Sequence, residues 1–260
     1  MLWYESLDEK IRDYLPDLKV VCDEPMSRHT SFRVGGPAKR MAFPSSGKQL
    51  VLLMSFAEEC GARPLVIGNG TNLLAPDEGL EFAHGIPGSL GGAVCMNAGA
   101  YGGEMKQVIK SAAVLFPQEG VRTLRGDELD FSYRHSVLSD RPEGVVLHAV
   151  VQLTPGDPEA IREKMRELMG RRKASQPLEW PSAGSTFKRP EGYFAGPLIE
   201  GCGLKGYTVG GAQVSEKHAG FVINRGGATC ADILAVIEHV QDTVERVHGV
   251  RLEPEVRILR

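Results

Sequence analysis

Glycines are the residues whose spacing most clearly suits chemistry in this chain. The segment 85–104, GIPGSLGGAVCMNAGAYGGE, has Gly at seven of its twenty positions. Such a run is favoured where the backbone must approach a ligand closely or adopt positive φ angles repeatedly. The apolar residues between the glycines argue against a disordered linker. We therefore expect a folded, tightly turned segment that presents backbone N–H groups to a ligand, often a phosphate.

A second glycine loop, GNGTN at 68–72, follows a short apolar run at 64–67 that predicts a buried strand. The loop lacks the GK[ST] of a nucleoside-triphosphate loop and the third Gly of a dinucleotide loop. Taken alone, such a segment is more often a hairpin turn than a ligand loop. Together with residues 85–104, it favours two loops that wrap one diphosphate from two sides.

Several polar side chains suit catalysis or binding, and each also has an ordinary structural explanation. SYRHS at 132–136 is typical of a surface cluster, and PSAGSTFKRP at 181–190 of a turn with exposed hydroxyls. No GxSxG elbow is present, so a hydrolase triad is not supported. The segment 204–224 resembles a ligand wall, although a solvated sheet edge explains it equally well. LEPEVRIL at 252–259 places Glu253 and Glu255 on one face of a predicted strand.

The elements that must position these residues alternate along the chain. Hydrophobic periodicity and capping residues predict helices over 6–15, 47–60, 158–172 and 229–248. Ser46 or a neighbour is expected to cap the second helix, and Thr229 and Gly249 are expected to cap and to end the last. Strands are predicted at 40–43, 108–115, 121–124, 144–153 and 255–259. From Leu178 onward the sequence becomes rich in Gly, Pro and Ser, with scattered aromatic residues. We expect two domains and place the boundary between them near residue 155. Periodicity alone leaves both α/β and α+β open.

Composition narrows the class of protein. The chain has 260 residues, 42% of them hydrophobic and 24% charged, and a net charge of −3. No basic field favours nucleic acid or an acidic membrane, so we expect a small-molecule ligand. Five cysteines without a CxxC pair indicate neither a disulfide framework nor a metal site, which fits a reducing compartment. Neither a signal peptide nor a membrane span is expected.

Seven motifs in order resemble one family. They are HTSFRVGGPA, LVIGNGTNLL, the glycine-rich run, FSYRHSVL, RRKASQPLEWPSAGSTFKRP, GCGLKGYTVGGAQVSEKHAGFVIN and LEPEVRIL, spanning roughly residues 28–259. Together they closely resemble the UDP-N-acetylenolpyruvoylglucosamine reductases (UDP-N-acetylmuramate dehydrogenases, the MurB family). The resemblance implies a cytoplasmic, monomeric flavoenzyme of peptidoglycan precursor synthesis. It implies an α+β fold, with an FAD-binding domain at 1–155 and a smaller UDP-sugar domain at 156–260 whose last strand returns to the active site.

The resemblance also implies a reaction and residue roles. NADPH would reduce FAD, and the flavin would pass hydride to the terminal carbon of the enolpyruvyl ether, while the neighbouring carbon is protonated. Ser185 matches the proton donor, and Arg134 and Glu255 match the other two catalytic positions. Substrate contacts are implied for Tyr133, Lys205, His218 and Asn224, and no metal is implied. FAD contacts are implied for the two glycine loops, at Gly68, Asn69, Gly70, Thr71, Asn72, Gly85, Ile86, Pro87, Gly88, Ser89, Gly91 and Gly92.

One departure from the family pattern lies after Leu80, which is joined directly to Glu81. In the family, a further strand–helix–strand of the flavin domain stands between the corresponding motifs. Two hypotheses follow. The chain is an NADPH-dependent reductase of UDP-N-acetylglucosamine enolpyruvate, or it is a trimmed member that binds UDP-sugar, holds FAD weakly and is inactive. A third hypothesis, another flavin oxidase of the same superfamily, is disfavoured by the C-terminal motifs.

Overall fold

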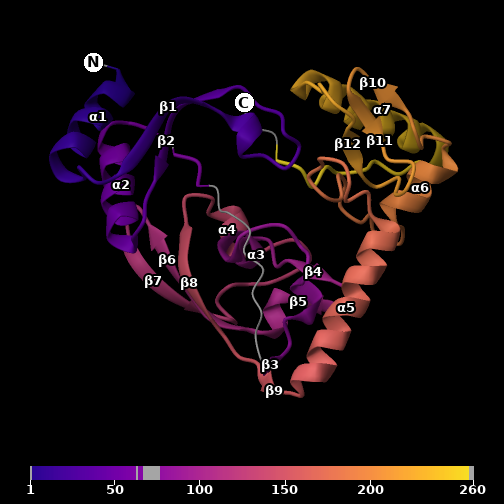
Figure 1. The fold of residues 1–260 in the computed structure, drawn as a ribbon, viewed down its shortest axis with the longest axis horizontal. Coiled ribbons are helices and arrows are strands. Elements are labelled where there is room, and N and C mark those ends of the chain that lie inside the picture. The colour runs from indigo at the N-terminus through magenta and orange to yellow at the C-terminus, as the bar shows by residue number, and fades with distance from the viewer. Residues whose placement is uncertain (1, 63, 67–76, 258–260) are drawn as a thin grey trace. The chain divides into compact units, whose positions relative to one another are not determined.

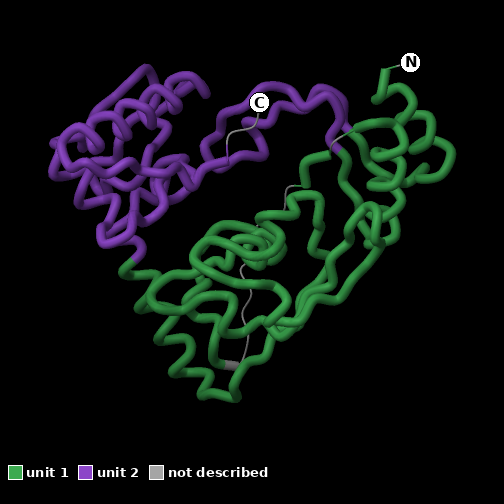
Figure 2. The backbone as a smooth tube through the Cα atoms, turned by 180° about the vertical axis from the view of Figure 1, so that it is seen from behind, with its two compact units in different colours: residues 1–20, 42–171 green, residues 21–41, 172–260 purple. Residues whose placement is uncertain are grey.

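The computed structural model describes residues 2–62, 64–66 and 77–257. It divides the chain into unit 1, residues 1–20 and 42–171, and unit 2, residues 21–41 and 172–260 (Figure 2). These units have other limits than the domains expected at 1–155 and 156–260, because they meet at 171/172 and residues 21–41 join the C-terminal part. The assignment of an FAD domain and a UDP-sugar domain stays a prediction. Each unit has a core of its own.

Two helices open unit 1. α1 (Trp3–Tyr14) and α2 (Gly47–Glu59) pack against each other through Leu7, Ile11 and Leu53. Ser46 caps α2, as the sequence predicts, because its side chain accepts the Gln49 N–H. Between the helices, β1 (Lys19–Pro25) and β2 (Pro37–Phe43) form a two-stranded sheet, with a 3₁₀ turn at Met26–Arg28.

The core of unit 1 lies on an antiparallel sheet of order β7-β6-β8 (Figure 1). Its strands are β6 (Ile109–Phe116), β7 (Gly120–Arg125) and β8 (Val145–Val151). β6 is the central strand and is almost continuously buried, whereas β7 is mostly exposed. This pattern follows from position, because only a central strand is covered by neighbours at both edges.

Short elements surround this sheet. They are β3 (Asp77–Glu78), η2 (Glu81–Ala83), α3 (Leu90–Cys95), β4 (Gly99–Ala100), β5 (Gly103–Glu104), η3 (Met105–Gln107), α4 (Val137–Asp140) and β9 (Thr154–Pro155). α3 contacts β8, β3 pairs with β9, and β4 pairs with β5. Tyr101 and Gly102, at φ 53° and 87°, make the tight turn that joins β4 to β5. α5 (Pro158–Ser175) follows and contains the limit between the units.

Unit 2 folds around its last helix. The antiparallel sheet β10 (Thr208–Val209), β11 (Ala212–Val214) and β12 (Val222–Asn224) contacts α7 (Cys230–His248) (Figure 1). α6 (Ala195–Gly201) contacts α7 as well. Val236, Val240 and Val244 of α7 are fully buried. Thr229 caps α7 and Gly249, at φ 68°, ends it, as the sequence predicts; Asp232 completes a capping box with Thr229.

The ladders β3–β9, β4–β5, β6–β7, β6–β8, β10–β11 and β11–β12 are antiparallel. The helix α3 contacts β8, and α7 contacts all three strands of the sheet in unit 2. The predicted α+β class is therefore confirmed, and α/β is excluded for these sheets. Among the described residues, no helix has the length and apolarity needed to cross a bilayer.

Two expected strands differ from the structure. Residues 64–66 form no strand, and Leu65 and Val66 are exposed rather than buried. A strand requires a ladder partner, and the described residues supply none for this apolar run. Near the C-terminus, only Pro254 makes a β-bridge, to Phe187. Of the expected strand at 255–259, residues 255–257 form no strand, and residues 258–259 lie outside the described residues.

Candidate functional site

The loop that carries Ser185 is fixed at both ends. Ser182 bridges Ile223 of β12, and Phe187 bridges Pro254. Gly184, at φ 78°, supplies a left-handed backbone that other residues rarely adopt. Ser185 itself is exposed. The loop therefore presents a serine hydroxyl on a backbone held between two other segments.

Thr186 connects Ser185 to two other predicted site segments of unit 2. It is fully buried, its N–H donates to the Gly220 oxygen at 2.8 Å, and its hydroxyl accepts the Val222 N–H at 3.0 Å. The Glu255 N–H in turn donates to the Thr186 oxygen at 2.8 Å. The structure thus brings the predicted catalytic residues Ser185 and Glu255 onto hydrogen-bonded segments, although they are far apart in sequence.

Lys205 and His218 lie beside α6. The Lys205 ammonium is 2.6 Å from a Glu200 carboxylate oxygen, and both side chains are partly exposed. A Cβ on Gly196, one turn before Glu200, would lie 3.4 Å from His218 Cε1, so the imidazole packs against that helical face. His218 Nδ1 accepts the Gly220 N–H at 3.1 Å, which leaves Nε2 as the ring donor. Burial lowers the pKa of His218 below its ordinary 6.5.

Asn224 is 7% exposed and is engaged in structural contacts. Its Nδ2 donates to the Phe32 oxygen at 2.9 Å, and its Oδ1 accepts the N–H groups of Gly226 and Ala228. These bonds fasten the HTSFR segment to β12 within unit 2. The predicted contact of Asn224 with substrate stays a prediction, and the observed contacts support a structural role.

In unit 1, Tyr133 and Arg134 form the tip of a two-residue turn. Ser132 and His135 exchange backbone hydrogen bonds at 3.1 and 3.2 Å across it. Tyr133 is 53% exposed, and the Arg134 guanidinium lies 5.1 Å from the centre of its ring. Arg134 has φ 55°, a left-handed conformation that costs a non-glycine residue about 1–3 kcal/mol. Such a cost, at a residue predicted to be catalytic, is consistent with a turn shaped for function.

The glycine-rich run begins with a loop at 85–92, all of which the structure describes. Gly85 and Gly88 have positive φ, and Ser89 caps α3 by accepting the Gly92 N–H at 3.1 Å. A Cβ on Gly88 would meet no atom within 4 Å, so its backbone faces open space. A Cβ on Gly91 would instead meet Val146 of β8 at 3.5 Å. Gly91 therefore lies against the sheet. The other predicted cofactor loop, 68–72, lies outside the described residues.

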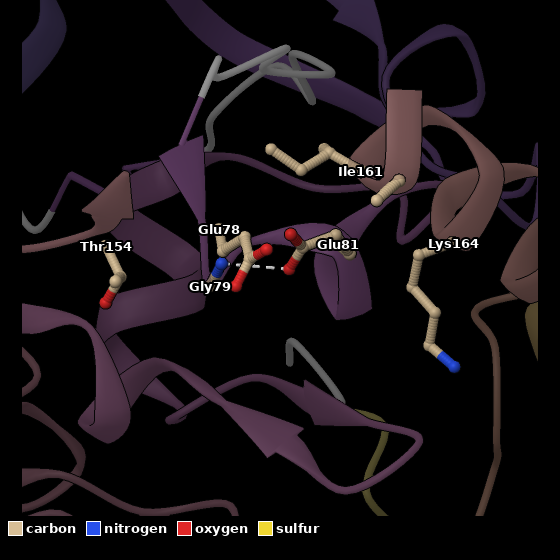
Figure 3. A pocket seen from close by; sticks show the side chains of 7 residues that line it. Glu78, Gly79, Glu81, Thr154, Ile161 and Lys164 are labelled. Carbon is tan, nitrogen blue, oxygen red and sulfur yellow. Dashed lines mark hydrogen bonds between the residues drawn. The ribbon is translucent and has the colours of Figure 1, made fainter. Parts of the chain in front are cut away.

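A hollow of about 510 Å³ lies in unit 1 beside the junction of Leu80 and Glu81 (Figure 3). Glu78, Glu81 and Lys164 contribute its charged side chains, and Ile161 contributes an apolar one. The Glu81 carboxylate accepts the Gly79 N–H at 2.9 Å, which fixes the chain at the junction. Of the predicted site residues that the structure describes, none lines this hollow.

Sequence reasoning missed two residues at these sites. Glu200 is the partner of Lys205, and Asn97 connects the glycine-rich run to the Tyr133–Arg134 turn through a bond from Nδ2 to the Ser132 oxygen. An Asn among glycines tolerates a left-handed backbone, so its position in MNAGA was the available signal for Asn97. Glu200 lies one turn into a short helix that periodicity does not reveal.

Solved structures include a close fold match. The crystal structure of UDP-N-acetylenolpyruvylglucosamine reductase (MurB) from Thermus caldophilus aligns with a TM-score of 0.74 and 29% sequence identity. The match covers 92% of this chain and 98% of that chain. The chain thus has the α+β fold of that reductase.

Sequence comparisons identify the family. Residues 176–259 match the family model of the UDP-N-acetylenolpyruvoylglucosamine reductase C-terminal domain. The reductase of that name from Caldanaerobacter subterraneus subsp. tengcongensis is 43% identical over 298 residues, and that from Agathobacter rectalis is 44% identical over 311. Each alignment covers 98% of both chains. The chain belongs to the UDP-N-acetylenolpyruvoylglucosamine reductase family.

The alignment lengths also bear on the junction after Leu80. The alignment of 298 positions exceeds the 260 residues of the chain by 38. The Caldanaerobacter relative therefore contains at least that many residues without a counterpart here. This difference supports the inference that a segment of the family is missing, whereas its position after Leu80 follows from the order of the motifs.

Proposed function

We propose that the chain reduces UDP-N-acetylglucosamine enolpyruvate to UDP-N-acetylmuramate, with FAD as bound cofactor and NADPH as reductant, in cytoplasmic peptidoglycan precursor synthesis. Membership of the reductase family supports the substrate class. The observation that carries the proposal is the backbone connection of the Ser185 loop to the Glu255 segment through Thr186. It holds a hydroxyl and a carboxyl group, both expected to be catalytic, on neighbouring segments of one unit.

The described glycine loop fits a nucleotide cofactor. The open space at Gly88 and the positive φ angles of Gly85 and Gly88 are suited to a backbone that a ligand approaches closely. Residues 85–89, together with 91 and 92, would hold FAD, with 68–72 as the second loop. When bound, FAD would supply hydride at the terminal carbon of the enolpyruvyl group.

Ser185 would give its hydroxyl proton to the carbon next to that terminal carbon. A serine hydroxyl is a weak acid in water, but the acceptor here is a strongly basic enolate-like carbon. Its exposure and its fixed loop suit direct transfer of a proton to substrate. Glu255 would stabilise the same centre from the neighbouring segment. Arg134 would bind the substrate carboxylate as negative charge builds on it, because a guanidinium offers two parallel donors.

Lys205 would bind the diphosphate of the UDP-sugar. Its ammonium forms an ion pair with Glu200 of α6. The imidazole of His218 packs beside Gly196, one turn earlier on the same helix. A phosphate oxygen near Lys205 would compete with the Glu200 carboxylate for the ammonium protons. Because Glu200 is largely exposed, water can replace the ion pair at little cost.

The absorbance spectrum of the purified chain, followed by a comparison of the half-reactions, tests the proposal. The wild-type protein should show flavin bands that bleach with NADPH and recover when the enolpyruvyl substrate is added. Ser185→Ala should bleach normally and form product about 10²–10⁴-fold more slowly. Equal losses in both half-reactions would refute the donor role. A colourless protein that rejects added FAD but binds UDP-sugar would favour the trimmed, inactive alternative, which the near-full-length identity does not favour.

A further inference from the structure

Asn97 is a buried polar residue of unit 1. It is 1% exposed and has φ 43°, so a polar side chain is buried on a left-handed backbone. Its Nδ2 donates to a Glu104 carboxylate oxygen at 2.9 Å and to the Ser132 oxygen at 3.0 Å, and its Oδ1 accepts the Lys106 N–H at 2.9 Å. All the polar atoms of its side chain are therefore used, which is the condition for burying an amide without a large free-energy cost.

These bonds join two parts of the chain that are 35 residues apart. Glu104 belongs to the β4–β5 hairpin, where it lies opposite Gly99. Ser132 begins the turn that carries Arg134. Asn97 thus fastens the base of the Arg134 turn to the hairpin.

Arg134 makes a second connection between the same two parts. Its Nη2 donates to the Gly99 oxygen at 3.3 Å. Gly99 is paired with Glu104 in the hairpin, and it packs so closely there that a Cβ on Gly99 would approach the Gly103 oxygen and Glu104 Cβ to within 3 Å. The guanidinium is therefore bonded to a paired residue of the hairpin, and the position of the turn decides whether it stays there.

We propose that Asn97 is the positioning residue for Arg134, and that its bond to the Ser132 oxygen holds the turn so that the guanidinium stays on the Gly99 oxygen. The inference rests on the catalytic role proposed for Arg134. Asn97 acts through the turn. Small displacements of a positioned group lower rates steeply, about 10²-fold for 1 Å.

Asn97→Gly is the decisive variant, because glycine accepts φ 43° without strain and removes only the side-chain bonds. Asp23→Gly is the matched control, since Asp23 also has a left-handed backbone, at φ 49°, but is exposed. The first readout needs no cofactor. Phenylglyoxal modifies accessible guanidinium groups, and mass spectrometry gives the rate at Arg134 alone. We expect that rate to rise severalfold in Asn97→Gly and to stay at the wild-type level in Asp23→Gly.

The second readout is a double-mutant cycle on the substrate half-reaction, normalised to bound flavin. Asn97→Gly should slow that half-reaction about 10- to 100-fold when Arg134 is present, with flavin reduction by NADPH unchanged. In an Arg134→Ala background, the same change should have almost no further effect, because the two residues act as one device. Additive losses would overturn the inference, as would an unchanged modification rate at Arg134.

Other outcomes remain distinguishable. Loss of flavin from Asn97→Gly with Arg134 still protected would overturn the inference and assign Asn97 to cofactor binding. Should Asn97→Gly fail to fold, Asn97→Asp has the same shape, keeps an acceptor for the Lys106 N–H and loses both Nδ2 bonds, so it must reproduce the increased modification of Arg134. A wild-type protein without turnover would remove the proposed function, whereas the modification rates would still decide the role of Asn97.

Discussion

Gly103→Ala tests the packing of the residues that follow the junction at Leu80 and Glu81. A Cβ on Gly103 would lie 2.5, 2.6 and 2.7 Å from Cδ1, Cγ and Cβ of Phe82. Ordinary contacts between carbons are about 3.5–4.0 Å, so the overlap is about 1 Å. It involves the root of the Phe82 side chain, which a rotation of the ring does not relieve. Either η2 or the β4–β5 hairpin must therefore move.

Overpacking of this kind typically lowers the free energy of unfolding by about 1–3 kcal/mol. Urea unfolding followed by circular dichroism should show a lower midpoint with an unchanged slope. Gly170→Ala is the control, because Gly170 is an exposed residue of α5 whose added Cβ would meet nothing within 4 Å. There, alanine should raise the free energy of unfolding by about 1 kcal/mol, as it does inside helices generally.

Phe82→Ala makes the test specific. Alone, it should cost about 3–5 kcal/mol, because a large buried side chain is lost. It also empties the space that the added Cβ needs, so Gly103→Ala should cost almost nothing more in this background. Wild-type stability in the single Gly103→Ala variant, or full additivity in the double variant, would show that Phe82 does not pack on Gly103 and that the chain beyond the junction is arranged differently.

Two further predictions concern unit 2. Lys205→Ala should raise the substrate KM about tenfold or more, with a smaller change in kcat, because a charge-assisted bond to phosphate is lost. Lys164→Ala is the control and should leave KM and kcat unchanged. A loss of kcat at constant KM in Lys205→Ala would contradict the diphosphate role. Burial lowers the pKa of His218, so the unfolded chain binds a proton on this imidazole at a higher pH than the folded chain does. The contribution of the neutral His218 to the free energy of unfolding is therefore complete above pH 6.5. It is lost as the pH falls through the lower pKa of the folded state. The urea midpoint should therefore decrease more between about pH 8 and about pH 5.5 in the wild type than in His218→Gln, and equal decreases would exclude this linkage.

Local signals in the sequence were sufficient for most of the regular elements. The valine stripe of α7, its Thr229 cap and the Gly249 stop each act within a few residues, and the structure confirms them. The α+β class and the family were likewise accessible, because the motifs stand in order along the chain. Such features depend on neighbours in sequence, which a single chain displays directly.

Contacts between distant segments were not accessible in this way. Asn224 and Phe32 are 192 residues apart, and their bond is one of the contacts that join residues 21–41 to the rest of unit 2. The roles of Asn97 and Glu200 depend in the same way on which carbonyl or ammonium the fold brings near them. Hydrophobic periodicity carries no information about those partners. The sequence motifs therefore indicate Arg134 and Lys205, but not Asn97 and Glu200, which contact their segments.

The surroundings of the junction after Leu80 indicate how the missing segment affects the folding of unit 1 and the binding of FAD. Phe82, immediately beyond it, belongs to the same buried core as Val94, Val114 and Leu138, and Leu80 packs against that core from the other side of the junction. Gly79, at φ 125°, and its bond to Glu81 close the chain between them. The core of unit 1 is therefore continuous across the junction. By contrast, the exposed run at 65–66 has no described strand beside it, and in sequence it precedes the predicted cofactor loop at 68–72. We therefore expect the missing residues to weaken the binding of FAD more than the folding of the unit.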